Sequence, residues 1–498
     1  MSGPSRRSKI IRDIAGSWLG LGADAITGFL LTRIILHSVG DASFGLWVVM
    51  SGLLGYYGLL DLGTRNAIIR YVARYNAQKD FDNLSKVVST ALATYVVVGA
   101  VALLVAGVVA WRLNDIFTFQ NPNDLLDARK LVLILGVGAA ISFPMNAFGG
   151  TLEGLQQFDW IGSVQATASV LRAITVFIFL KLGYGIVAVG LITVVFNVVA
   201  GGVNAAFVLN RLSHVRFVLA GIHRETLVTL AGFGVVTFWI GVSNRLRFES
   251  DALVIGNMLG LQLVAIFAIA SKIIAYSTEV VGAMSAVFTP RLSHADAVGD
   301  GALLSSMTLT GNYYASLLSF PIALALVVFG KDFIQLWVGS DYLSSYTVLV
   351  ILAFPTALYA SQGATMRMMY GIGRHKPLAI ALLCEGAVNI GLSIALARRY
   401  GIVGVAWGTA IPLMVTGLVV LPWFARQSLQ ISIATYWRSA QLPALTMLSP
   451  VVLLFLLVST VYPRPTVAVA ALEFAVGAVL YGLIVMRAVR MARGLSAR

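Results

Sequence analysis

Thirteen charged residues lie inside the long apolar segments of this chain of 498 residues. Placing a charged side chain in hydrocarbon costs roughly 2.5–3.5 kcal/mol on insertion scales, so each needs a partner or a wet cavity. Such groups could bind charged ligands or carry protons and metal cations. The bases are Arg33, Arg172, Arg245, Arg247, Lys272 and Arg367, and the acids are Asp24, Asp61, Glu249, Asp251, Glu279, Glu385 and Glu473.

Four of these charges are concentrated between residues 245 and 251. Arg245 precedes Glu249 by four residues, and Arg247 precedes Asp251 by the same spacing, so each pair can form an ion pair on a helix. In one interpretation, these pairs only hold helices together. In the other, at least one arginine faces a central cavity and binds an anionic group, because guanidinium donors match phosphate oxygens in a bidentate fork.

Arg33 and Lys272 extend the predicted substrate-binding set, because both are bases within apolar segments. Asp24 has two interpretations. It could take up H⁺ or help to bind Na⁺ as a coupling step, or it could make an interhelical hydrogen bond. Coupling or gating is also the role predicted for the acids Glu249 and Asp251.

Motifs for enzyme chemistry are missing. We find no Gly-rich phosphate loop, no HExxH motif and no cluster of Cys or His. The single cysteine, Cys384, excludes a disulfide framework and a Cys-based metal site. We therefore expect no catalytic residues, no bound metal and no cofactor beyond a coupling ion.

The composition indicates a membrane protein. Hydrophobic residues make up 58% of the chain and charged residues 11%, and the mean hydropathy is +0.87. Soluble domains usually have about 25% charged residues, so a soluble enzyme is excluded. The net charge of +14 does not indicate a nucleic-acid partner, because the bases are scattered among apolar runs.

Apolar runs long enough to span a bilayer, which takes about 20 residues, occur fourteen times. We therefore expect an all-α, polytopic protein. The predicted spans are 11–38, 43–66, 87–111, 130–152, 160–181, 185–209, 227–258, 261–289, 304–329, 345–368, 377–397, 401–422, 443–461 and 466–487.

The distribution of Lys and Arg predicts the orientation. An even number of spans places both termini on one side. With the N-terminus in the cytoplasm, the inside segments carry 21 basic residues and the outside segments carry 8. The positive-inside rule therefore predicts that both termini are cytoplasmic.

An internal repeat divides the spans into two sets of six. The matches are Tyr184-Gly185-Ile186-Val187 with Tyr400-Gly401-Ile402-Val403 at an offset of 216 residues, Gly154 with Gly371 at 217, and Gly40, Ser51 and Tyr56 with Gly260, Ser271 and Tyr276 at 220. Both copies enter the membrane in the same direction, so an axis along the membrane normal should relate them. We predict an N-lobe (1–210), a C-lobe (211–425) and a C-terminal addition (426–498), with a cavity for alternating access between the lobes.

Two polar segments have alternative interpretations. Residues 244–251 could be a loop that follows a span ending at Ser243, but the offset of 220 places Asp251 over Leu31, inside the first span. The segment 423–442 could lie on the inner membrane surface as an amphipathic helix, or it could be a polar loop.

The second span and the residues after it resemble a known family. The matching residues are Phe44-Gly45-Leu46-Trp47, then Tyr57-Gly58-Leu59-Leu60-Asp61-Leu62-Gly63, and then Arg65, Arg70, Tyr71 and Ala73. They resemble the polysaccharide-transporter branch, of the O-antigen flippase type, of the multidrug, oligosaccharidyl-lipid and polysaccharide exporter superfamily. The resemblance implies a MATE-like fold and a place in the bacterial inner membrane.

The resemblance also implies a function. Members of the family move polyprenyl-diphosphate-linked oligosaccharides from the inner to the outer leaflet, and the diphosphate would suit the four basic residues. Asp61 and Arg65 would bind substrate or brace a gate at the inner end of the second span. The implied partners are the lipid-linked oligosaccharide, membrane lipids and polysaccharide biosynthesis proteins.

Two other functions remain open from the residues. A multidrug or organic-cation antiporter of the same fold should present acids without nearby bases. A membrane polysaccharide polymerase or acyltransferase should need a large outside loop or an intramembrane histidine.

Overall fold

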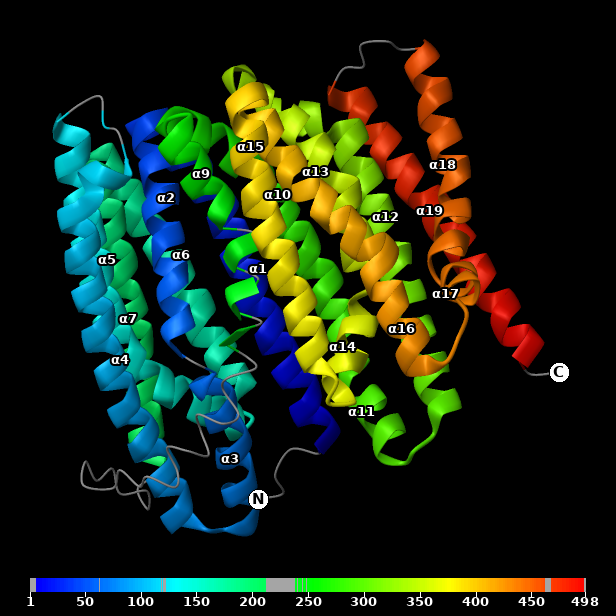
Figure 1. The fold of residues 1–498 in the computed structure, drawn as a ribbon, viewed down its shortest axis with the longest axis horizontal. Helices are drawn as coiled ribbons and strands as arrows, with labels where there is room; N and C mark the ends of the chain where they lie inside the picture. Colours follow the sequence, from blue (N-terminus) through cyan, green and yellow to red (C-terminus); the bar gives the residue numbers. More distant parts are fainter. Residues whose placement is uncertain are drawn as a thin grey trace. The chain divides into compact units, whose positions relative to one another are not determined.

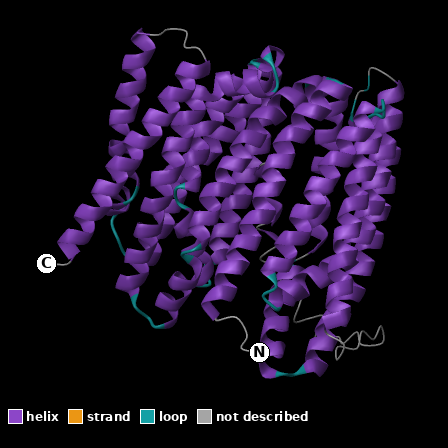
Figure 2. Cartoon of the chain, turned by 180° about the vertical axis from the view of Figure 1, so that it is seen from behind, coloured by secondary structure: helices purple, strands orange, loops and turns teal. Residues whose placement is uncertain are grey.

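The computed structural model describes residues 6–61, 63–117, 119, 122–211, 238–239, 241–243, 245–247, 249–461 and 467–496. Over these residues the chain forms helices joined by short loops, without strands (Figure 2). By packing it forms two compact units, Met1–Ala265 and Ile266–Arg498. The lobe boundaries at residues 210 and 425 follow from the repeat and stay predictions.

In the first unit, three helix pairs make the most extensive contacts: α4 with α5, α1 with α6, and α5 with α7. Figure 1 shows α4, α5 and α7 side by side. The elements are α1 (Arg6–Val39), α2 (Asp41–Tyr57), the 3₁₀ turn η1 (Gly58–Asp61), α3 (Thr64–Gln78), α4 (Phe81–Ile116), α5 (Pro122–Gly154), α6 (Phe158–Lys181), α7 (Ile186–Arg211) and α9 (Ser250–Met258).

The second unit is centred on α12, which packs on α13, α14 and α18, while α13 also packs on α15. A π-helical segment, η4, follows α15 directly. The elements are α10 (Leu261–Ala286, which begins in the first unit), α11 (Thr289–Ala297), α12 (Gly301–Trp337), η3 (Ser340–Tyr342), α13 (Ser344–Ala360), α14 (Gly363–Gly371), α15 (His375–Val415), η4 (Thr416–Val420), α16 (Leu421–Leu429), α17 (Ile433–Ser439), α18 (Gln441–Val461) and α19 (Val467–Ser496).

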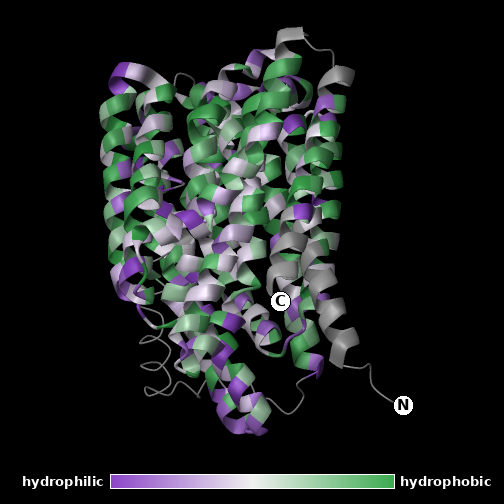
Figure 3. Ribbon diagram, turned by 90° about the vertical axis from the view of Figure 1, so that its right-hand side faces the viewer, coloured by the Kyte–Doolittle hydropathy of each residue, from purple (hydrophilic) through white to green (hydrophobic). Residues whose placement is uncertain are grey.

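The long helices carry an apolar surface suited to lipid. Trp111 and Leu104 are each 70% exposed and Leu457 is 66% exposed. Burial against lipid removes the cost of leaving such side chains in water. Hydrophobic residues predominate along the long helices in Figure 3, with some hydrophilic residues among them and more at the lower end of the view.

Among the described residues, nine helices are long and apolar enough to span a membrane, or ten if α13 and α14 form one broken span. The protein is therefore a multi-pass membrane protein. The predicted spans 11–38 and 466–487 fall on α1 and α19, which are not among the nine, and most of 227–258 lies outside the described residues. The total of fourteen stays a prediction.

The helix α15 consists of two helices that meet at Gly401. This glycine has φ 60° and ψ −141°, a conformation that only glycine adopts readily. The Ser393 hydroxyl donates to the Val405 carbonyl at 3.4 Å. Twelve residues would separate these groups by about 18 Å along a continuous helix, so the two halves lie side by side. The separate spans predicted at 377–397 and 401–422 match this hairpin.

The repeat is also present in the backbone. Asp80 precedes α4 and Asp300 precedes α12, and each carboxylate accepts a hydrogen bond from the backbone N–H three residues later, at 3.1 and 2.8 Å. The preceding residues, Lys79 and Gly299, have φ of 56° and 70°. The offset of 220 residues therefore relates two turns with the same geometry.

Two further turns recur in the same way. Gly40 before α2 and Gly260 before α10 have φ of 80° and 100°, again at an offset of 220. Gln156 and Gly373 follow the glycines that end α5 and α14, and their φ values are 57° and 71°. Positive φ at corresponding positions indicates that each half of the chain turns at the same points.

Candidate functional site: intramembrane charges of the first unit

An ion pair joins Arg245 to Glu249 in the segment that precedes α9. The pair lies against α2 beside Gly55, where a Cβ atom would come within 2.6 Å of an Arg245 guanidinium nitrogen. The Tyr56 hydroxyl donates to the Arg245 carbonyl oxygen at 3.4 Å. Because residue 55 is a glycine, α2 leaves room for the side chains of Arg245 and Glu249.

The two arginines of this segment differ in exposure. The Arg245 side chain is 36% exposed, whereas Arg247 is fully buried and Asp251 is 3% exposed. In this conformation Arg245 is accessible to a ligand and Arg247 is not. The predicted Arg245–Glu249 pair is present, and a binding role for either arginine stays a prediction.

The segment is helical on both sides of Glu249. Residues 245–247 are helical and α9 begins at Ser250. Asp251, in the first turn of α9, is buried. These features favour the interpretation of residues 244–251 as part of a span rather than a polar loop.

Asp61 and Arg65 form separate contacts where α2 passes into α3. The Tyr95 hydroxyl of α4 donates to Asp61. Arg65 donates to the Glu153 carboxylate of α5 at 2.6 Å. Gly63 between them has φ 73°, so this part of the motif requires a glycine. Both residues therefore join helices in this conformation, and whether they bind substrate or brace a gate stays a prediction.

Sequence reasoning missed Tyr95 and the partner role of Glu153. Tyr95 is fully buried and stacks on Phe143 with ring centroids 6.1 Å apart. From sequence alone, a tyrosine in an apolar helix cannot be distinguished from an ordinary core aromatic. Asp61, near the end of the second span, needs a hydrogen-bond donor. Nothing in the sequence pattern shows that α4 supplies this donor.

Asp24 on α1 accepts hydrogen bonds from three side chains of α6. The Gln165 amide donates at 2.9 Å, the Arg172 guanidinium at 3.4 Å, and the Ser169 hydroxyl also donates. The Arg172 charge neutralises the carboxylate without an added cation. This geometry favours the interhelical hydrogen-bond interpretation, and Arg172 is a partner that the sequence did not assign.

The other two predicted bases lie in different units. Arg33 is exposed on α1 of the first unit. Lys272 is half-buried on α10, in the part that belongs to the second unit. Their roles in substrate binding stay predictions.

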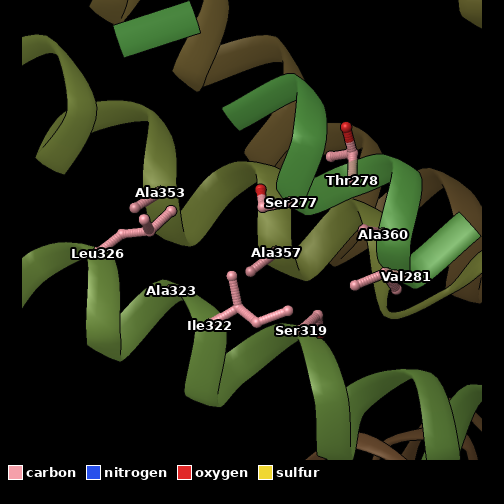
Figure 4. A pocket seen from close by; sticks show the side chains of 10 residues that line it. All are labelled: Ser277, Thr278, Val281, Ser319, Ile322, Ala323, Leu326, Ala353, Ala357 and Ala360. Carbon is pink, nitrogen blue, oxygen red and sulfur yellow. The ribbon is translucent and has the colours of Figure 1, made fainter. Parts of the chain in front are cut away.

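A small hollow and a larger one lie among the described residues of the second unit. The smaller one, shown in Figure 4, has a volume of ≈ 10 Å³ and is lined by Ser277, Thr278, Ser319 and side chains that are mainly alanines. Its volume suits one water molecule. The larger, open hollow of ≈ 500 Å³ lies over α12 and includes Ser305 and Tyr313. Among the described side chains, no group of three His, Cys, Asp or Glu residues is placed to hold a metal ion.

The sequence has relatives in bacteria and archaea. A Shigella flexneri protein that carries the name of an O-antigen transporter is 22% identical over 436 residues, covering 83% of this chain and 97% of that protein. An uncharacterized membrane protein of Methanocaldococcus jannaschii is 21% identical over 454 residues, covering 86% of each.

Solved structures share the fold. The lipid II flippase MurJ, in its inward closed conformation, matches with a TM-score of 0.73 and 14% identity, covering 97% of this chain and 99% of that one. An inward-facing multidrug resistance MATE family transporter of the MOP superfamily matches with a TM-score of 0.70 and 20% identity, covering 85% and 96%. The predicted all-α, MATE-like fold is confirmed.

Residues 11–295, more than half of the chain, match the family model described as polysaccharide biosynthesis protein. The chain therefore belongs to this family of membrane proteins.

Proposed function

We propose that this protein is a flippase that moves a polyprenyl-diphosphate-linked oligosaccharide from the inner to the outer leaflet. Its family and its relative named as an O-antigen transporter support this substrate class. The observation that carries the proposal is the partly exposed guanidinium of Arg245 within an apolar segment. It would pair with a diphosphate, while the polyprenyl tail remains in the bilayer.

The proposal also covers the location and the orientation of the protein in the membrane. The protein would lie in the bacterial inner membrane with both termini in the cytoplasm, as the excess of basic residues in the inside segments favours. It would work by alternating access, driven by a gradient of H⁺ or Na⁺. Its partners would be the lipid-linked glycan, membrane lipids and polysaccharide biosynthesis proteins.

An organic-cation antiporter is less well supported. Such a transporter needs an acid that is available to a cationic substrate. Asp24 is paired with Arg172, and Glu249 with Arg245. A flippase requires no unpaired acid, and the family and the relative named as an O-antigen transporter support it.

The test is flipping by purified protein in proteoliposomes with a fluorescent polyprenyl-diphosphate oligosaccharide. Removal of Arg245 by Arg245→Ala should slow flipping at least tenfold, roughly the loss of one charge-assisted contact of 1.4 kcal/mol or more. Arg112→Ala is the control, because Arg112 forms an exposed ion pair with Asp115 at the end of α4. Normal flipping by Arg245→Ala at normal protein levels would contradict the proposal.

A further inference from the structure

A buried polar network in the second unit joins three parts of the chain that are distant in sequence. Its centre is the Tyr436 hydroxyl on the short helix α17, and the side chains around it come from α12, α14 and the break between α13 and α14. Asn312, Gln362, Thr365 and Tyr436 are all fully buried. In a membrane protein no lipid can replace a lost hydrogen bond, so the arrangement of these groups is tightly constrained.

Tyr436 uses every hydrogen-bonding position of its hydroxyl. It donates to the Gln362 side-chain oxygen at 2.9 Å and accepts from the Asn312 amide at 3.0 Å. The Thr365 hydroxyl lies 2.8 Å away. A phenol has one proton and accepts two hydrogen bonds, so Thr365 must donate in this contact.

Gln362 extends the network to two irregular points of the backbone. It lies where α13 and α14 meet at a bend of 41°. Its amide nitrogen donates to the Leu358 carbonyl at 3.1 Å and to the Gly417 carbonyl of the π-helical segment η4 at 2.8 Å. Sharp kinks arise at prolines, at small residues, at π-bulges or where a side chain inserts into the helix ladder. Pro355 lies seven residues before Gln362, whereas the small residues Ser361 and Gly363 and the inserted side chain of Gln362 lie at the bend itself.

The backbone at the break is satisfied by the same network. The Thr365 N–H donates to the Asn312 side-chain oxygen at 3.2 Å, and the Asn312 amide donates to the Thr365 hydroxyl at 2.7 Å. Displacement of Tyr436 would therefore remove three hydrogen bonds around the bend at once. The position of α17, which packs beside α12 and α16 (Figure 1), is linked to the shape of a broken helix.

We infer that Tyr436 is a positioning residue for transport, which acts through Gln362 to set the α13–α14 bend and the adjoining π-helical segment. The inference rests on the proposed function, because helix bends of this kind matter when a transporter changes access. It assigns a role to α17, a short helix within the segment 423–442, for which the sequence left open an amphipathic surface helix or a polar loop. Movement of α17 would release the bend, and its return would restore it.

The first experiment needs no substrate. Hydrogen exchange is measured on the full-length protein with Tyr436→Phe, with Gln362→Leu and with both substitutions. We expect exchange to rise together over residues 358–371 and 414–421 in each variant. Tyr346→Phe is the matched control, because it removes one hydroxyl hydrogen bond, of 2.6 Å, between α13 and α12 away from the bend. Unchanged exchange at either segment would overturn the inference.

The second experiment separates positioning from simple destabilisation. Flipping of the fluorescent lipid-linked oligosaccharide is measured in proteoliposomes, and its binding is measured in micelles. We expect Tyr436→Phe to lower the flipping rate at least tenfold and to leave binding within twofold of wild type. The double variant should be no slower than either single variant, because both residues act on one bend. Multiplying losses, or parallel losses of rate and binding, would overturn the inference.

The two proposals fail in different ways. If the wild-type chain does not flip the lipid but the exchange pattern is as expected, the proposed function is contradicted and the control of the bend is supported. If the wild-type chain flips the lipid and the variants match it, the role of Tyr436 is contradicted alone.

Discussion

The C-terminal end of α2 is held by two polar contacts of different exposure. The Asp61–Tyr95 contact involves a fully buried hydroxyl, whereas the Arg65–Glu153 pair is 41% and 22% exposed at its two side chains. An exposed ion pair is screened by solvent and contributes roughly 0–1 kcal/mol. Most of the bracing energy at this end of α2 should therefore come from Tyr95.

Tyr95→Phe should lower the free energy of unfolding by about 1–3 kcal/mol, because it leaves the Asp61 carboxylate without its buried donor. Chemical denaturation in micelles measures the change. Tyr184→Phe is the control, since Tyr184 is 55% exposed. Equal stability of the Tyr95 variant and the wild type would show that water or another donor replaces the hydroxyl.

Asp24 can be tested by two substitutions. Asp24→Asn keeps a side-chain oxygen that can accept hydrogen bonds from α6. We therefore expect its flipping rate to stay within about threefold of wild type, which is less than the tenfold change that corresponds to 1.4 kcal/mol. Asp24→Leu should reduce the amount of folded protein, because Gln165, Ser169 and Arg172 lose their acceptor. Loss of gradient-driven flipping by Asp24→Asn, with normal protein levels, would instead establish a coupling role.

At the scale of elements, the matched turns of the two halves are held by caps. The Asn83 backbone N–H donates to Asp80, and this bond, with one from the Asn83 side chain, holds the pKa of Asp80 below its ordinary value. These hydrogen bonds stabilise the charged, deprotonated form of the Asp80 carboxylate. The stabilisation is therefore present above the ordinary pKa of 3.8 and is lost as the pH falls through the lowered value.

Asp80→Ala should lower the melting temperature at pH 7, because α4 loses its capping acceptor. The difference from wild type should shrink as the pH falls through the lowered pKa of Asp80, because the wild-type carboxyl then also becomes protonated. Thermal unfolding across this pH range is the measurement. Asp296→Ala, at an exposed position of α11, should show no such trend.

Sequence patterns predicted most helices, but not their irregular points. The pair Tyr400-Gly401 matched Tyr184-Gly185, so a turn was expected there and was found. The break at Gln362 was not expected. Hydrophobic periodicity marks where helices run, and a single glutamine between small residues does not interrupt that pattern. The side chains that form hydrogen bonds at this break come from α12 and α17, which are brought together only by tertiary packing.

Only the local contacts of the candidate site were predicted, because its other contacts also depend on tertiary packing. The i, i+4 spacing predicted the contact of Arg245 with Glu249, because both lie on one helical segment. The contacts of Asp24 with α6 and of Asp61 with α4 join helices more than thirty residues apart. Local periodicity carries no information about such partners.

At the scale of the whole molecule, the uneven distribution of Lys and Arg between the two sides of the predicted topology predicts an orientation. A fluorescent protein fused after Arg498 should fold and fluoresce in the cytoplasm, and alkaline phosphatase at the same place should be inactive. A phosphatase inserted near Arg398, an outside position in the predicted topology, should be active. The reverse pattern at both sites would show that the positive-inside rule fails for this chain.

The hairpin at Gly401 bears on how the protein is made. As one continuous helix, the 41 residues of α15 would measure about 62 Å, roughly twice the thickness of the hydrocarbon core, so both halves can lie in the bilayer only if the chain doubles back. The left-handed turn at Gly401 is strained for any residue with a side chain. During synthesis, this one glycine therefore helps decide whether the chain doubles back, and so on which side of the bilayer the last two long helices emerge.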